Sequence, residues 1–231
     1  MPPFLATLIR QYILRRMRRI EAFMAQPHEV QHRVWQALLA QGRRTAFGAE
    51  HGFNRIQTPD AFAATVPVRP YEALYPYIER TLKGEADVLW PGRASWFAKS
   101  SGTTNDKSKF IPITEENLEY CHFAGGRDML ALYFRAVPHS QLLSGKALTI
   151  GGSHQISQFN RHARHGDLSS VLLENLPLFY GWRRAPSKAV ALMSNYEAKL
   201  ERMAAEVIKE PISSLVGVPT WTVILIRKIL E

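Results

Sequence analysis

The sequence has very little cysteine and no long apolar run. Cys121 is the single cysteine among 231 residues, which excludes a disulfide within the chain and favours a reduced, cytoplasmic setting. The longest apolar candidate, residues 216–230, is interrupted by Pro219, Arg227 and Lys228, so no integral membrane segment is expected. A secretory signal is not indicated either, because the N-terminal arginines follow the apolar residues instead of preceding them.

The composition indicates a folded, basic protein. Hydrophobic residues make up 46% and charged residues 21% of the chain, which suffices for one sizeable core and argues against disorder. The formal net charge is +9, and the arginines gather in two groups: Arg10, Arg15, Arg16, Arg18 and Arg19, and Arg161, Arg164, Arg183 and Arg184. Motifs of specific nucleic-acid-binding domains are absent, so no specific nucleic-acid partner is expected. A non-catalytic protein that binds anionic membrane or nucleic acid through its basic first helix remains an alternative.

Alternating helical and extended patterns predict a layered α/β domain. Helices are predicted over residues 4–24, 27–41, 58–64, 71–83, from Thr114 for about twenty residues, from Ser187 to Val207, and from Pro219 onward. Strands are predicted over residues 87–90, 95–98, 109–113, 146–150 and 212–216. In the helix that begins at Ser187, a stripe at spacings of three and four indicates core packing: Met193, Tyr196, Leu200, Met203 and Val207.

Residues 100–110, Ser-Ser-Gly-Thr-Thr-Asn-Asp-Lys-Ser-Lys-Phe, form the most informative stretch. Small side chains let the backbone approach an anion, amides and hydroxyls can donate to it, and lysines supply positive charge, so this composition suits a polyphosphate. The GxxxxGK[ST] and GxGxxG patterns do not fit, because Asp106 precedes Lys107 and the loop has one glycine. On its residues alone, the stretch could also be a Ser/Thr-rich surface turn.

The longer run 99–114, KSSGTTNDKSKFIPIT, resembles the phosphate-binding loop of adenylate-forming enzymes of the GH3 family of acyl-acid amido synthetases. Asn105 and Asp106 stand where the family has a glycine-containing turn, and both residue types tolerate left-handed backbone. The resemblance implies that ATP phosphates are bound by Ser100, Ser101, Gly102, Thr103, Thr104 and Lys109, with Lys107 as a second cation. Further similar segments follow in the family's order: 45–53, 65–80, 148–152, 166–179 and 216–221.

The resemblance also implies how the chain is organised. Residues 1–231 would be part of the large, mixed-sheet α/β adenylation domain at the N-terminus of such an enzyme. Residues 1–44 would form a helical segment, and residues 85–231 the α/β part that carries the loop. The family's Tyr-x-x-Ser-Glu element is not found here, and the small C-terminal domain would lie beyond Glu231. We therefore expect a fragment that is inactive alone and belongs to a monomer at full length; a genuine short form is the alternative.

The implied reaction has two steps and uses ATP with Mg²⁺. A carboxylic acid would form acyl-AMP, and an amine or amino acid would then take the acyl group as an amide. The resemblance places Arg127 at the acyl substrate, and a guanidinium fork suits a carboxylate. Gly151 and Gly152 follow a predicted strand, where glycine can mark close approach to a ligand, so they are assigned to the acyl pocket, with a simple strand-end turn as the alternative. The alternative for Arg127 is a surface arginine paired with Asp128 or Glu119. An acyl-CoA ligase of the same superfamily would share the first step and differ in the acceptor.

No protein metal ligand and no catalytic nucleophile are predicted. His154, His162 and His165 do not have the spacing of a ligand set, and no carboxylate except Asp167 accompanies them. Cys121 and His122 are adjacent on a predicted helix, so their side chains do not face each other.

Overall fold

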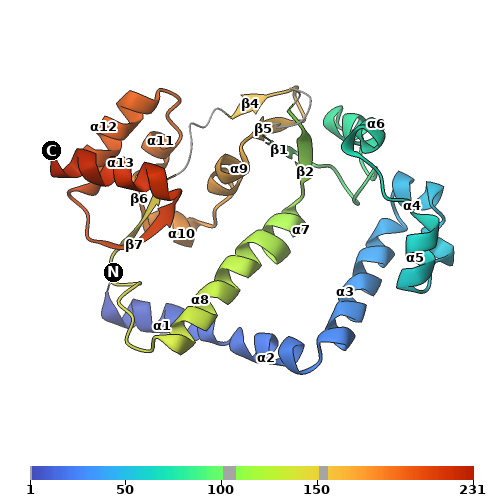
Figure 1. The fold of residues 1–231 in the computed structure, drawn as a ribbon, viewed down its shortest axis with the longest axis horizontal. Helices are drawn as coiled ribbons and strands as arrows, with labels where there is room; N and C mark the ends of the chain where they lie inside the picture. The colour runs from blue at the N-terminus through green and yellow to red at the C-terminus, as the bar shows by residue number, and fades with distance from the viewer. Residues whose placement is uncertain (1, 101–107, 151–155) are drawn as a thin grey trace. The chain divides into compact units, whose positions relative to one another are not determined.

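The computed structural model describes residues 2–100, 108–150 and 156–231 (Figure 1). The chain divides into two compact units. Unit 1 contains Met1–Arg18, Tyr120–Ile156 and Gly166–Glu231, and unit 2 contains Arg19–Glu119 and Ser157–His165. Each unit has its own small sheet covered by helices, which confirms the predicted α/β class.

The elements follow one another with short connections. The helices are α1 (Pro3–Leu14), α2 (Met17–Ala25), α3 (Pro27–Gly42), α4 (Ala46–Glu50), η1 (Phe53–Arg55), α5 (Pro59–Thr65), α6 (Tyr71–Leu82), α7 (Glu115–Asn117), η2 (Leu118–Phe123), α8 (Ala124–Ala136), α9 (Leu168–Glu174), α10 (Leu178–Trp182), α11 (Lys188–Ala191), α12 (Tyr196–Val207) and α13 (Pro219–Leu230). The strands are β1 (Trp96–Lys99), β2 (Phe110–Ile113), β3 (Lys146–Ile150), β4 (Ser157–Gln158), β5 (Arg164–Gly166), β6 (Arg184–Ala185) and β7 (Ile212–Gly217).

The first sheet has the strand order β2-β1-β5-β4, with antiparallel β1–β2 and β4–β5 pairs. Three consecutive residues of β1, Trp96 to Ala98, are buried, so both faces of this strand are covered. Helix α6 supplies Ile78 and Leu82 to the core around Phe97, which is completely buried. Burial of side chains of this size contributes roughly 1.5–3 kcal/mol each, so α6 and β1 fix each other in unit 2.

The predicted strand over residues 87–90 is wrong. Asp87 adopts a left-handed conformation with φ of 56°. Its backbone N–H donates to the carbonyl of Gly92 at 2.9 Å, and the N–H of Gly92 donates to the Asp87 carboxylate at 2.8 Å. These bonds close a loop over residues 87–92, and the carbonyls of Asp87 and Val88 accept the N–H groups of Ala46 and Phe47 at the start of α4, so this segment pairs with a helix start and not with a strand.

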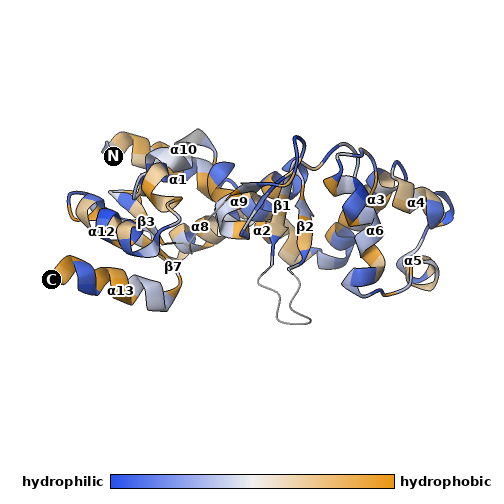
Figure 2. Cartoon of the chain, turned by 90° about the horizontal axis from the view of Figure 1, so that it is seen from above, coloured by the Kyte–Doolittle hydropathy of each residue, from blue (hydrophilic) through white to orange (hydrophobic). Residues whose placement is uncertain are grey.

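The second sheet is parallel, with the order β6-β3-β7. Leu148 and Ile150 of β3 are buried in a core that also contains Met203 and Val207 of α12 and Leu225 of α13. This cluster confirms that the stripe on α12 is core, although Tyr196 at its start is exposed. Helix α13 carries apolar residues on its outer side as well (Figure 2), among them Val223, Ile226 and Leu230.

Two predicted long helices are each divided in the structure. The helix expected over residues 4–24 breaks at Arg15 and Arg16, where the N–H of Arg16 bonds to the carbonyl of Ile13 in a tight turn. The helix expected from Ser187 ends at Ala191, and Asn195 then starts α12 by accepting the N–H of Ala198 at 2.9 Å. An Asn N-cap offers a new helix start inside an apparently continuous pattern.

The helix capped by Thr114 continues as predicted to Ala136, but it contains a π-helical segment, η2. Helix α8 packs against α1 in unit 1 (Figure 1). Arg10 of α1 donates to the carbonyl of Phe134 at 3.3 Å and lies over its ring, and Arg16 forms an ion pair with Asp128. Two arginines of the N-terminal basic group therefore have partners inside the protein. Among the residues that the structure describes, no helix is both long and apolar enough to cross a bilayer.

The parallel sheet requires glycine at position 145. A Cβ there would overlap the carbonyl oxygen of Pro211, which accepts the N–H of Lys146 at 2.7 Å. We predict that Gly145→Ala lowers the free energy of unfolding by about 1–3 kcal/mol, because β3 and β7 must move apart. Urea unfolding followed by circular dichroism measures this.

Gly125→Ala in α8 is the matched control, since a Cβ there meets nothing within 4 Å. It should raise stability by about 0.5–1 kcal/mol, as alanine is the better helix former. Equal stability of the two variants would contradict the close approach of β3 and β7.

Candidate functional site

The predicted phosphate loop connects the two strands of a hairpin. Strands β1 and β2 pair from Trp96 opposite Ile113 to Lys99 opposite Phe110. The next pair of residues is also joined: the N–H of Ser100 donates to the carbonyl of Lys109 at 2.9 Å, and the N–H of Lys109 donates to the Ser100 hydroxyl at 3.3 Å. The two ends of the loop are therefore held side by side.

Several predicted site residues lie outside the described part of the chain. They are Ser101, Gly102, Thr103, Thr104 and Lys107 in the loop, and Gly151 and Gly152 after β3. Their assignment to phosphate or acyl substrate stays a prediction. Of the predicted phosphate-binding residues, the structure describes Ser100 and Lys109, and it brings these two together at the base of the hairpin.

Lys109 lies against an aromatic ring. Its Nζ is 5.3 Å from the ring centroid of Tyr71, the first residue of α6. The Tyr71 hydroxyl donates to the carbonyl of Phe110 at 3.1 Å and accepts its N–H at 2.8 Å. Burial raises the pKa of Tyr71, while its bond to Phe110 opposes the rise. Tyr71 therefore fastens the first residue of β2 to α6 and supports the Lys109 side chain. The sequence predicted a helix start at Tyr71 but gave no signal for this contact.

His165 of β5 contacts Phe110, the first residue of β2. Its ring centroid lies 5.2 Å from that of Phe110, at a steep angle, and Phe159 is a second aromatic neighbour. The Nδ1 atom is buried without a hydrogen-bond partner among the described residues. Burial, and then the charge of Lys99, lower the pKa of His165. A neutral imidazole thus packs beside the hairpin, which a search for metal-ligand spacing could not reveal.

Arg127, the predicted acyl-carboxylate ligand, lies half-buried on α8 in unit 1. Its neighbour Asp128, one of the two carboxylates considered as its surface partner, forms an ion pair with Arg16. The hairpin belongs to unit 2, so the proximity of Arg127 to it stays a prediction. Cys121 is exposed. Within the described residues, no three His, Cys, Asp or Glu side chains come together as a metal site.

The amino-acid sequence of residues 16–231 matches the model of a known family, the GH3 family N-terminal domain. The chain belongs to the GH3 family. The hairpin loop that suggested the resemblance lies within the matched residues, and the match extends through both compact units.

Curated relatives are plant acid-amido synthetases. A probable indole-3-acetic acid-amido synthetase GH3.2 of Oryza sativa subsp. japonica is 35% identical over 91 residues, which are 39% of this chain and 15% of that protein. Indole-3-acetic acid-amido synthetase GH3.6 of Arabidopsis thaliana is 31% identical over 101 residues, 43% of this chain and 16% of that protein. The matched segments thus span about a sixth of these relatives.

A solved structure, the GH3.15 acyl acid amido synthetase, has a similar fold. The TM-score is 0.66 at 21% identity, with 79% of this chain and 32% of that chain covered. The same synthetase in complex with 2,4-DB gives a TM-score of 0.63 at 22% identity, over 75% of this chain and 30% of that chain. These likenesses confirm the fold of part of an acyl acid amido synthetase.

The environment of His165 predicts a pH dependence of stability. Its pKa is lowered in the folded state, so the unfolded chain binds the proton more readily. Its contribution is therefore complete above the ordinary histidine pKa of about 6.5, and it is lost as the pH falls below that value and through the lower pKa of the folded state. We expect His165→Phe, which keeps an aromatic ring, to show a smaller loss of stability between neutral pH and about pH 5 than the wild type.

Thermal unfolding across this pH range measures the difference. His28→Phe is the control, because His28 is an exposed histidine of unit 2 and should leave the pH profile unchanged. An unaltered profile in His165→Phe would contradict a buried neutral imidazole at this position.

Proposed function

We propose that the β1–β2 hairpin binds the phosphate groups of ATP in an acyl-acid amido synthetase reaction. The observation that carries the proposal is the pairing of Ser100 with Lys109 at the base of a small-residue loop. Hydroxyls and a glycine allow the loop backbone to approach an anion. Lys109 makes no ion pair with a carboxylate among the described residues, and its ammonium rests on the Tyr71 ring. A phosphate oxygen would thus meet a cation that no described acidic side chain neutralises.

The proposed chemistry has two balanced steps. A carboxylate oxygen of the acid attacks the α-phosphorus of ATP, and the bond from that phosphorus to the bridging oxygen breaks, which releases pyrophosphate. An amine nitrogen then attacks the acyl carbon; the bond to AMP breaks and the nitrogen loses a proton. Displacements at phosphorus depend on positioning and on neutralising charge. Lys109 and the loop amides would hold the β- and γ-phosphates during the first step.

Magnesium fits this proposal as an ion carried by ATP. Mg²⁺ commonly binds through substrate phosphates and one or two carboxylates, keeping several waters. The described residues offer no cluster of three ligands that could hold it by themselves, so we assign no protein residue to it. In the proposal, the ion would shield the triphosphate charge, and Lys109 would add a fixed cation on the protein side.

The acyl substrate is proposed to be a carboxylic acid, with Arg127, Gly151 and Gly152 near it. The names of the plant relatives mention indole-3-acetic acid and, in Nicotiana attenuata, a jasmonoyl-amino acid product, which supports a carboxylic acid as substrate and an amino acid as acceptor. An acyl-CoA ligase would make the same acyl-AMP. Product analysis separates the two, since the first yields an amide and the second a thioester.

The proposal predicts that Lys109→Ala weakens binding of tripolyphosphate to this chain by about tenfold or more, because a hydrogen-bonded charge is removed from an anion. Tripolyphosphate is the suitable probe because the proposal concerns the phosphate groups of ATP alone. Titration followed by backbone amide shifts, with Ser100 and Lys109 as reporters, measures the affinity at the hairpin.

Lys83→Ala is the matched control: Lys83 is an exposed lysine of the same unit, paired with Glu79. Its removal subtracts the same charge and should leave the affinity unchanged. Equal weakening in both variants would mean that tripolyphosphate senses only net charge. No shift at the hairpin of the wild type would refute phosphate binding there.

A further inference from the structure

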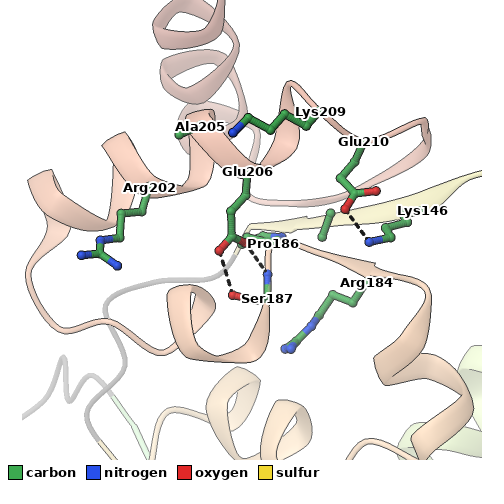
Figure 3. Close-up of a pocket in the computed structure, with 10 residues that line it drawn as sticks. Lys146, Arg184, Pro186, Ser187, Arg202, Ala205, Glu206, Lys209 and Glu210 are labelled. Carbon is green, nitrogen blue, oxygen red and sulfur yellow. Dashed lines mark hydrogen bonds and ion pairs between the residues drawn. The ribbon is translucent and has the colours of Figure 1, made fainter.

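A pocket opens in unit 1 at the edge of the parallel sheet (Figure 3). It has a volume of about 570 Å³, within the range of small-molecule sites. Its wall is formed by Lys146 of β3, by Arg184 of β6 with the residues that follow, and by residues of α12 together with Lys209 and Glu210, which follow that helix. Among the wall residues, arginines and lysines outnumber carboxylates by two.

Arg184 is the unusual residue of this wall. It is only 9% exposed, and its Nε and Nη1 atoms are buried without a hydrogen-bond partner. Burial is the main influence on its pKa and lowers it, while the charges of Glu174 and Glu206 oppose the change. Buried guanidinium groups normally have hydrogen-bonded partners, because an unpaired buried charge is strongly destabilising. Arg184 therefore has donors that the described chain does not use.

The nearby carboxylates are already engaged. Glu206 accepts the backbone N–H of Ser187 at 2.7 Å and its hydroxyl at 3.0 Å. Glu174, the other carboxylate whose charge acts on Arg184, binds Lys188 at 2.6 Å. Figure 3 shows the bonds of Glu206 and no bond from it to the Arg184 guanidinium. The acceptor for Arg184 must therefore come from a group that the described residues do not supply.

Two further cations border the pocket. Arg202 of α12 and Lys209, two residues beyond the end of that helix, line it (Figure 3), and neither has an ion-pair partner within the described ranges. Lys146, in contrast, is paired with Glu210 at 2.6 Å. The pocket thus combines a buried, unsatisfied guanidinium with two exposed cations on the same wall, and its two carboxylates are held by other partners.

We propose that this pocket binds a small-molecule oxyanion, a phosphate or carboxylate group, on the guanidinium of Arg184. Both groups present two coplanar oxygens to a guanidinium fork, and such charge-assisted pairs are among the strongest hydrogen bonds in proteins. Arg202 and Lys209 attract the anion at the entrance. The volume exceeds that of a phosphate ion, so the anionic group is attached to a larger body.

This pocket differs from the proposed synthetase site. It borders β3 at Lys146, the first residue of the strand, whereas Gly151 and Gly152 follow the last residue, Ile150. A five-residue strand is about 17 Å long at 3.3–3.4 Å per residue. The hairpin proposal rests on Ser100 and Lys109, which do not line this pocket. The oxyanion site therefore goes beyond the proposed reaction and does not depend on it.

The test follows the Arg184 side chain directly. In ¹⁵N-labelled protein, the Arg184 Nε–H resonance is assigned by its loss in Arg184→Gln, and inorganic phosphate or acetate is titrated at constant ionic strength. We expect a saturable shift at millimolar concentration with phosphate, acetate or both, and the responding anion identifies the group that the site prefers. Arg202→Gln should weaken the same response several-fold and leave the Arg184 resonance in place.

Arg18→Gln is the matched control, since Arg18 is an exposed arginine of the same unit that does not line the pocket; its titration should match the wild type. A shift with neither anion, or an equal shift with chloride, overturns the proposal. If Arg184→Gln does not fold, the Arg184 Nε–H resonance is assigned in the wild type by side-chain triple-resonance experiments, so both outcomes can still be measured. Failure here also leaves the hairpin proposal intact, because that one is followed at Ser100 and Lys109.

Discussion

The pairing of β1 with β2 is the constraint on which the candidate site depends. The register ends with Lys99 opposite Phe110, and the bonds between Ser100 and Lys109 extend it by one step. Neither strand can slide, because Phe97 is completely buried against α6 and Phe110 is bonded to Tyr71 of the same helix. The loop between them is thus mounted on a rigid stem. Function often resides on loops held this way, since the scaffold fixes their ends and leaves their composition free to suit a ligand.

Strand β3 has the corresponding role in unit 1. Leu148 and Ile150 lie on one face of this central strand and provide apolar contacts to α12 and α13. Its pairing with β6 places the backbone of Arg184 opposite Ala147. The pairing of β6 with β3 thereby holds the Arg184 side chain in a buried position. Burial of a charged group is unfavourable because the group loses its hydration. A charged side chain that backbone pairing holds in place is well suited to bind a ligand, because the folding free energy already offsets the cost of burying it.

The sequence predicts best what is local. β3 is observed over the predicted residues, since its apolar run is bounded by glycines at 145 and 151. The helix from Tyr71 is also correct within one residue, ending at Leu82 before the left-handed Gly84. The missed features need tertiary information. Apolar spacing continues across residues 187–207, so the break at Asn195 is invisible in the pattern. Likewise, the contacts of Phe110 with Tyr71 and His165 join residues 39 and 55 positions apart along the chain.

The net charge of the chain illustrates the same limit. A formal charge of +9 suggests a surface for polyanions, but several of the arginines also have partners within the fold. Arg183 donates to the carbonyls of Leu142 and Gly145 at 2.7 and 2.9 Å, and burial lowers its pKa. Arg43 donates to the carbonyl of Phe53, and Arg164 lies 4.1 Å from the ring centroid of Trp96. A guanidinium has five donors and remains charged when partly buried, so it can bind carbonyls that lack strand or helix partners. Counting every arginine toward a nucleic-acid surface overlooks these contacts. It also conceals Arg184, the one buried guanidinium among the described residues whose Nε and Nη1 have no hydrogen-bond partner.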